Sequence, residues 1–83
     1  MKTKAAGKNK IEKKIKDIIA HYFQISADKI KTTDTIASLG GDSLELVEIV
    51  LEIESEFAFL ISDEEAYKFK NIGDLIKHVK ENL

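Results

Sequence analysis

The sequence predicts an all-α fold, arranged as an irregular four-helix bundle with a long first loop and a short third helix. Apolar residues recur at intervals of three and four, and no stretch alternates convincingly at the period of two that strands show. A helix-start signature, Asn, Asp or Ser followed three residues later by Glu or Asp, occurs four times. These starts predict helices over residues 10–23, 42–57, 62–68 and 71–82.

The first predicted helix follows Asn9, and Glu12 completes its start signature. The apolar side chains of this helix form one stripe that would face the core, at positions 11, 15, 18, 19, 22 and 23. Residues 1–8, MKTKAAGK, have no apolar period. We expect them to form a disordered basic tail, followed by a single domain over residues 9–83.

A long connection over residues 24–41 separates the first two predicted helices. Thr and Asp residues at positions 32–35 favour local turns within it. Four apolar residues are spaced along the connection as anchors, which predicts a loop packed across the bundle: Ile25, Ile30, Ile36 and Leu39.

The composition excludes several classes of protein. Eighty-three residues make one small domain, and the absence of Cys excludes disulfides and Cys-ligated zinc. The apolar runs are too short for a transmembrane segment, and no secretory signal follows the lysine-rich start. We therefore expect a cytoplasmic protein, and any thiol chemistry would need a sulfur supplied from outside the chain.

Charge is distributed unevenly along the chain. Residues 1–31 carry nine Lys, whereas residues 42–65 carry nine carboxylates and no Lys. Four neighbouring Glu fall within one narrow arc of the second helix, where like charges repel: Glu45, Glu48, Glu52 and Glu56. The alternative is an ordinary solvated face, which usually mixes both signs. We favour a docking surface for a basic protein, weakened by salt, and expect no nucleic-acid partner.

Ser43 stands in the segment Leu-Gly-Gly-Asp-Ser-Leu at the start of this helix. Asp42 is the better helix cap, which leaves the Ser43 hydroxyl free in the first turn, where a phosphate is favoured. Gly-Asp-Ser-Leu also occurs in one group of esterases, but those need a larger α/β domain with a strand before the serine. Asp74 and His78 lie four apart on one helix as a surface pair, and His21 lies in another helix. We expect no catalytic residue and no metal site, and a serine that receives a group from another enzyme.

The segment LGGDSLELVEIVLEIESEFAFLISDEEAYKF resembles the core of an acyl carrier protein, and the resemblance extends over about residues 10–80. It implies that Ser43 accepts 4′-phosphopantetheine from coenzyme A through a separate phosphopantetheinyl transferase, with Asp42 and Leu44 flanking it. The arm would carry acyl intermediates as thioesters for fatty-acid or related acyl-chain biosynthesis. The protein would be a non-catalytic, monomeric carrier that other enzymes use as a substrate.

The resemblance also assigns partners and contacts. Acyl-chain synthases, reductases and transferases would dock through basic patches on four carboxylates: Glu45, Glu48, Glu52 and Glu54. The growing chain would be sheltered among the helices by eight apolar residues: Val47, Val50, Ile53, Phe57, Ile61, Ala66, Phe69 and Leu75.

Two alternatives remain open at this point. Gly-Gly before Asp42 is frequent in aminoacyl and peptidyl carriers, so the chain could be a stand-alone carrier of that kind in a specialised pathway. It could also be an unmodified small helical adaptor that binds a basic partner through the acidic helix. The sequence departs from the family where Ser62 replaces a common Pro and where residues 58–60 lack a usual acidic residue.

Overall fold

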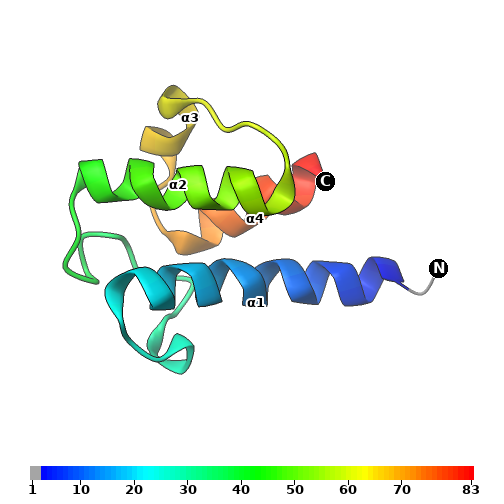
Figure 1. Ribbon diagram of the computed structural model, residues 1–83, viewed down its shortest axis with the longest axis horizontal. Coiled ribbons are helices and arrows are strands. Elements are labelled where there is room, and N and C mark those ends of the chain that lie inside the picture. The colour runs from blue at the N-terminus through cyan, green and yellow to red at the C-terminus, as the bar shows by residue number, and fades with distance from the viewer. Residues whose placement is uncertain (1–2) are drawn as a thin grey trace.

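The computed structural model describes residues 3–83, and all regular structure within them is helical, as the sequence predicts. The elements are α1 (Thr3–Phe23), the short 3-10 helix η1 (Ala27–Lys29), α2 (Ser43–Phe57), α3 (Asp63–Lys68) and α4 (Ile72–Asn82). Figure 1 shows α1 along one side of the molecule, with α2 running antiparallel to it. α1 packs on both α2 and α4, and the short α3 packs on α2.

Three of the predicted helix starts are confirmed, and each is fixed by one local hydrogen bond. The capping side chain accepts the backbone N–H of the residue three positions on: Asp42 from Glu45, Ser62 from Glu65 and Asn71 from Asp74. At the first two starts the Glu side chain also accepts the backbone N–H of the capping residue, which completes a capping box. Each cap contributes about 1 kcal/mol, which is a large share of the stability of a helix as short as α3.

The predicted start of the first helix is wrong. α1 begins at Thr3, so Asn9 lies within the helix and not at its start. Lys and Ala, which dominate residues 4–8, are good helix formers, so the backbone continues without an apolar stripe. Residues 3–8 of the expected tail are therefore helical, and Met1 and Lys2 lie outside the described residues. The division of the chain at residue 8 into tail and domain stays a prediction.

The core is aliphatic and is contributed by every α-helix. Its fully buried large side chains come from α1, α2 and α4: Ile15, Ile19, Ile49, Ile53, Ile72, Leu75 and Val79. Ala66 supplies the contribution of α3. Burying one such large side chain is worth about 1.5–3 kcal/mol, so these contacts and not helix propensity hold the bundle together.

The long connection between α1 and α2 is held to the start of α4. The backbone N–H of Ile72 donates to the Asp34 carbonyl, and that of Gly73 donates to the Thr32 carbonyl, each at 2.8 Å. Of the four expected anchors, Ile30 is buried, and Ile36 and Leu39 are half-buried. The fourth, Ile25, is exposed; it follows Gln24, where the chain leaves α1 with a positive φ of 58°.

Candidate functional site

Ser43 is the first residue of α2, and its side chain is exposed. The capping box directly before it joins Asp42 and Glu45 through two hydrogen bonds of 3.0 Å. Neither of these bonds uses the Ser43 hydroxyl. The hydroxyl therefore stands at the helix N-terminus without a capping role.

The two glycines before Asp42 serve different purposes. Gly40 has a φ of +95°, a backbone conformation that side chains disfavour. Gly41 instead allows a close approach, since a Cβ there would lie 2.7 Å from the Cγ2 atom of Ile36 and 2.8 Å from the Cζ atom of Phe23. The Gly41 N–H also donates to the Ile36 carbonyl at 2.9 Å. The loop that presents Ser43 is thus packed tightly against the end of α1.

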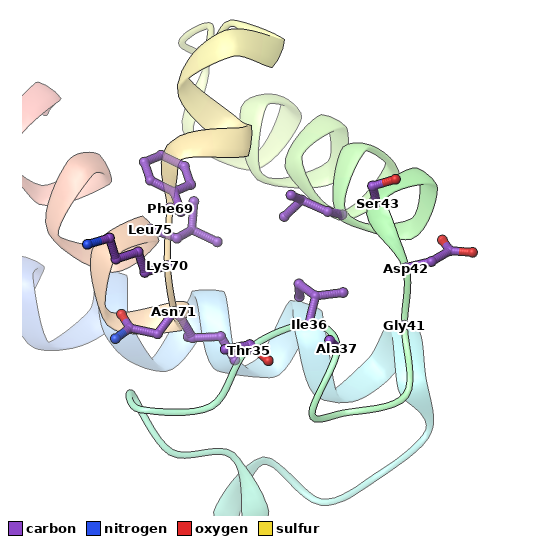
Figure 2. A pocket seen from close by; sticks show the side chains of 12 residues that line it. Thr35, Ile36, Ala37, Gly41, Asp42, Ser43, Phe69, Lys70, Asn71 and Leu75 are labelled. Carbon is purple, nitrogen blue, oxygen red and sulfur yellow. The ribbon is translucent and has the colours of Figure 1, made fainter.

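An apolar cavity of about 230 Å³ opens beside Ser43. Figure 2 shows it between the start of α2, the loop at Ile36 and the junction of α3 with α4. Twelve residues line it: Thr35, Ile36, Ala37, Gly41, Asp42, Ser43, Leu46, Phe69, Lys70, Asn71, Ile72 and Leu75. An engineered apolar cavity of about 150 Å³ binds benzene, so this space is large enough for a hydrocarbon group.

Two of the eight residues expected to shelter an acyl chain, Phe69 and Leu75, line this cavity. Four of the others are buried in the core (Val50, Ile53, Ile61 and Ala66), and two are half-buried (Val47 and Phe57). Four further apolar residues line the cavity and are not among these eight: Ile36, Ala37, Leu46 and Ile72. Only Leu46 carries a local signal in the sequence, because it lies one helical turn from Ser43. The other three lie in the long loop or at the start of α4, and tertiary contacts bring them to the site.

The four expected docking carboxylates differ in their surroundings. Glu45 belongs to the capping box, and Glu54 accepts the backbone N–H of Ile61 at 2.6 Å. Both are half-buried, whereas Glu48 and Glu52 are exposed. Part of the acidic face therefore maintains the fold.

Glu48 also contacts α1, since its carboxylate accepts a hydrogen bond from the Tyr22 hydroxyl. This bond favours the protonated phenol, and together with desolvation and the nearby carboxylates it raises the pKa of Tyr22 to about 12. A second link joins the same helices, because the Lys14 Nζ atom lies 3.1 Å from the Glu56 Oε2 atom. The acidic helix is thus bound to α1 at both a tyrosine and a lysine.

Neither histidine of the chain lines the cavity beside Ser43. His21 is exposed on α1. His78 faces α3, with its Nε2 atom 3.9 Å from the Glu65 Oε1 atom. The expected surface pair of Asp74 and His78 does not form in the described residues, because the Asp74 carboxylate instead accepts the Lys70 backbone N–H at 2.9 Å.

Residues 3–83 contain no group of His, Cys, Asp and Glu side chains placed to hold a metal ion. No helix in that range is long and apolar enough to cross a membrane. The polar side chains that line the cavity are those of Thr35, Asp42, Ser43, Lys70 and Asn71.

Comparison with known proteins agrees with this geometry. A family model described as a phosphopantetheine attachment site matches residues 13–79. The acyl carrier protein of Lactobacillus acidophilus is 43% identical over 68 residues, covering 81% of this chain and 85% of that protein. The acyl carrier protein of Clostridium acetobutylicum is 43% identical over 68 residues as well, covering 81% of this chain and 88% of that protein.

A solved structure extends the likeness to three dimensions. This is the acyl carrier protein from Enterococcus faecalis, in which novel structural components contribute to high thermal stability; it matches with a TM-score of 0.77 at 34% identity. The match covers 92% of this chain and 98% of that one. With the attachment-site model spanning most of its length, this chain belongs to the acyl carrier protein family, whose prosthetic group is 4′-phosphopantetheine.

Proposed function

We propose that this protein carries acyl intermediates as thioesters on a 4′-phosphopantetheine arm attached to Ser43, for fatty-acid or related acyl-chain biosynthesis. One observation carries the assignment: an exposed hydroxyl stands free at the start of α2, directly beside an apolar cavity. The arm supplies a thiol, which the chain lacks because it contains no Cys.

The residues around Ser43 fit a phosphate-linked group. The first backbone N–H groups of a helix have no partner within it, and Asp42 satisfies only that of Glu45. The N–H groups of the first turn and the helix dipole favour a phosphate by about 0.3–1 kcal/mol. The carboxylates of Asp42 and Glu45 oppose it with a similar magnitude. The covalent bond to Ser43, and not affinity for the phosphate, would therefore hold the arm.

The cavity would receive the first part of the acyl chain. Leu46 lies one helical turn beyond Ser43 on α2, and Phe69 and Leu75 line the far side. Burial in such a space is worth about 0.8 kcal/mol per methylene, enough to withdraw the chain from water. The chain performs no catalysis in this proposal: Ser43 is modified by another enzyme, and both histidines lie away from it.

The acidic face of α2 would dock onto basic patches of the phosphopantetheinyl transferase and of acyl-chain synthases, reductases and transferases. Glu48 and Glu52 support this role because both are exposed on that face. Electrostatic steering by such a face raises association rates and falls with ionic strength. We expect a cytoplasmic carrier that works as a monomer, since one chain encloses its own core.

The test is incubation with coenzyme A and a phosphopantetheinyl transferase, followed by intact mass measurement. We expect the wild type to gain one phosphopantetheinyl group and the Ser43→Ala variant to gain none. Ser55→Ala is the matched control, because Ser55 is exposed on the same helix and should leave the gain unchanged. A wild type that stays unmodified while a known carrier is loaded would refute the proposal, and a modified Ser43→Ala would refute the site.

A further inference from the structure

Tyr22 of α1 lies against the acidic face of α2. The C-terminal end of α1 runs beside the start of α2 (Figure 1), and the Tyr22 hydroxyl there donates a hydrogen bond to the Glu48 carboxylate. The tyrosine ring is half-buried and packs against the core, and it makes an edge-to-face contact with Phe23 at a centroid distance of 5.3 Å. Tyr22 is therefore a hydrogen-bond donor held in place at the edge of a surface that the sequence places on α2 alone.

Glu48 differs from the other carboxylates of α2 in how it is held. Glu45 and Glu54 are half-buried and accept backbone N–H groups of the fold. Glu56 pairs with a lysine of α1, so an internal cation already balances its charge. Glu52 is exposed, and in the part of the chain that the structure describes no hydrogen bond or ion pair fixes its carboxylate. Glu48 alone among these five is exposed and also held by a hydrogen bond from an uncharged donor.

The hydrogen bond from Tyr22 fixes the Glu48 carboxylate without neutralising it. The bond itself is the main reason that the pKa of Tyr22 is raised to about 12, so the phenol stays protonated and uncharged at neutral pH. The negative charge of Glu48 is therefore left available to an outside cation. A lysine in the place of Tyr22 would also hold the carboxylate, but it would cancel that charge, as it does at Glu56.

A carboxylate that is already held binds a partner's cation at a lower entropic cost than a mobile one. Ordering an exposed, flexible side chain on binding consumes rotamer freedom that must be repaid by the contact. Tyr22 restricts Glu48 in the unbound protein, so association does not have to order it. The carboxylate of Glu52 has no such restraint from the described residues, and a partner would have to order it.

We propose that Tyr22 is a positioning residue for docking, which holds the Glu48 carboxylate where a lysine or arginine of a partner enzyme pairs with it. The inference rests on the proposed function, because the partners are the enzymes that attach the arm or act on its cargo. It extends the docking surface from α2 onto the C-terminal end of α1. The fitting partner is a protein with a basic patch, because the group presented is an anion.

The experiment measures binding of the apo protein to a phosphopantetheinyl transferase by stopped flow, and then arm transfer after coenzyme A is added. Tyr22→Phe removes one hydroxyl and keeps the ring that packs on the core. The association rate should stay within about twofold of the wild type, because the charge of the acidic face does not change. The dissociation rate should rise about two- to tenfold, because the partner must now order Glu48. The KM for the carrier should rise while kcat stays the same.

Two further variants make the result specific to this hydrogen bond. Tyr67→Phe is the matched control, because it removes the same hydroxyl from an exposed tyrosine of α3 and should leave both rates at the wild-type values. Glu48→Gln should itself raise the dissociation rate. In that background Tyr22→Phe should add less than about twofold, because the charge that Tyr22 positions is gone. Urea unfolding checks that each variant is folded.

The outcomes separate the two proposals. If the wild type gains no arm while a known carrier does, the proposed function fails and this inference fails with it. If the wild type gains the arm but Tyr22→Phe dissociates at the wild-type rate, the inference alone is overturned. It is also overturned if Tyr22→Phe has its full effect in the Glu48→Gln chain, or if Tyr67→Phe has an equal effect, because the hydroxyl would then act through something other than Glu48.

Discussion

At Gly41, the absence of a side chain lets two larger residues hold the loop that precedes Ser43. Ile36 from the loop and Phe23 from α1 approach so closely that an added Cβ would lie within 2.8 Å of both. The Ser43 hydroxyl is only two residues further along, so its position depends on this contact. At Gly40 the requirement is different, since no atom lies within 4 Å of an added Cβ and only the φ of +95° favours glycine.

We therefore expect Gly41→Ala to destabilise the fold by about 1–3 kcal/mol, the usual cost of an overpacked site. Phe23→Leu in the same chain should recover part of this loss by making room for the new methyl group. Gly40→Ala, whose cost would arise from backbone strain, should not be rescued by Phe23→Leu. Urea unfolding of the wild type, the three single variants and the two double variants that combine Phe23→Leu with each glycine change gives the coupling free energy of each pair. Equal coupling free energies at both glycines would contradict the steric explanation.

The hydrogen bond between Tyr22 and Glu48 predicts a specific pH dependence. The pKa of Tyr22 is raised to about 12, so the folded state holds the phenolic proton more tightly than the unfolded chain, whose tyrosines titrate near 10. The stabilisation is therefore complete below about pH 10 and is lost as the pH rises through about 12.

Absorbance titration of a Tyr67→Phe chain isolates the Tyr22 phenol, because the sequence contains two tyrosines. We expect a transition near 12 that moves toward 10 when Glu48→Gln removes the charged acceptor. Circular dichroism over the same range checks that the helices persist. An unchanged transition in the Glu48→Gln chain would show that this carboxylate does not hold the proton.

At the scale of the element, the acidic residues of α2 fall into two groups, those that hold the fold together and those that are exposed. These residues look alike in the sequence, but the structure gives them unlike partners. Glu45 closes the capping box, Glu54 accepts the N–H of the buried Ile61, and Glu56 pairs with Lys14 of α1. Glu52 is exposed, and no hydrogen bond or ion pair ties it to the described residues of the other helices. Glu52 is therefore the cleanest site at which to test docking separately from folding.

We expect Glu52→Lys to lower the association rate with a basic partner such as the transferase, most strongly at low salt, and to change stability by less than about 0.5 kcal/mol. Glu54→Ala should instead cost about 1–3 kcal/mol, because the N–H of Ile61 loses its acceptor. Stopped-flow binding at several ionic strengths and urea unfolding distinguish the two effects. Unchanged, salt-independent association in Glu52→Lys would contradict a docking role for this face.

At the scale of the whole molecule, the protein is compact and electrically polar. Its radius of gyration is 12.1 Å, close to the value of about 12 Å expected for a globular chain of this length. Six of the nine Lys in residues 1–31 belong to α1, while the acidic segment covers α2 and the start of α3. α1 packs along α2, and the ion pair of Lys14 and Glu56 joins the lysine-rich helix to the acidic one. A basic partner would therefore meet the molecule preferentially with α2 foremost.

How far the sequence predicts this structure depends on the range of the contacts involved. The starts at Asp42, Ser62 and Asn71 are predictable because each requires one hydrogen bond to a residue three positions away. Ser43 stands out for the same reason, since its neighbour already occupies the cap. The cavity is not predictable in this way, because Ile36 and Ile72 reach it only when the long loop binds the start of α4.

The two backbone hydrogen bonds between that loop and α4 give the cavity one rigid side. Ile72 and Gly73 cannot separate from Asp34 and Thr32 without losing both bonds, so these bonds resist separation of the loop from the start of α4. The opposite side is formed where α3, a helix of six residues, meets α4. We therefore expect a bulky group in the cavity to displace α3 and to leave the wall nearest the loop in place.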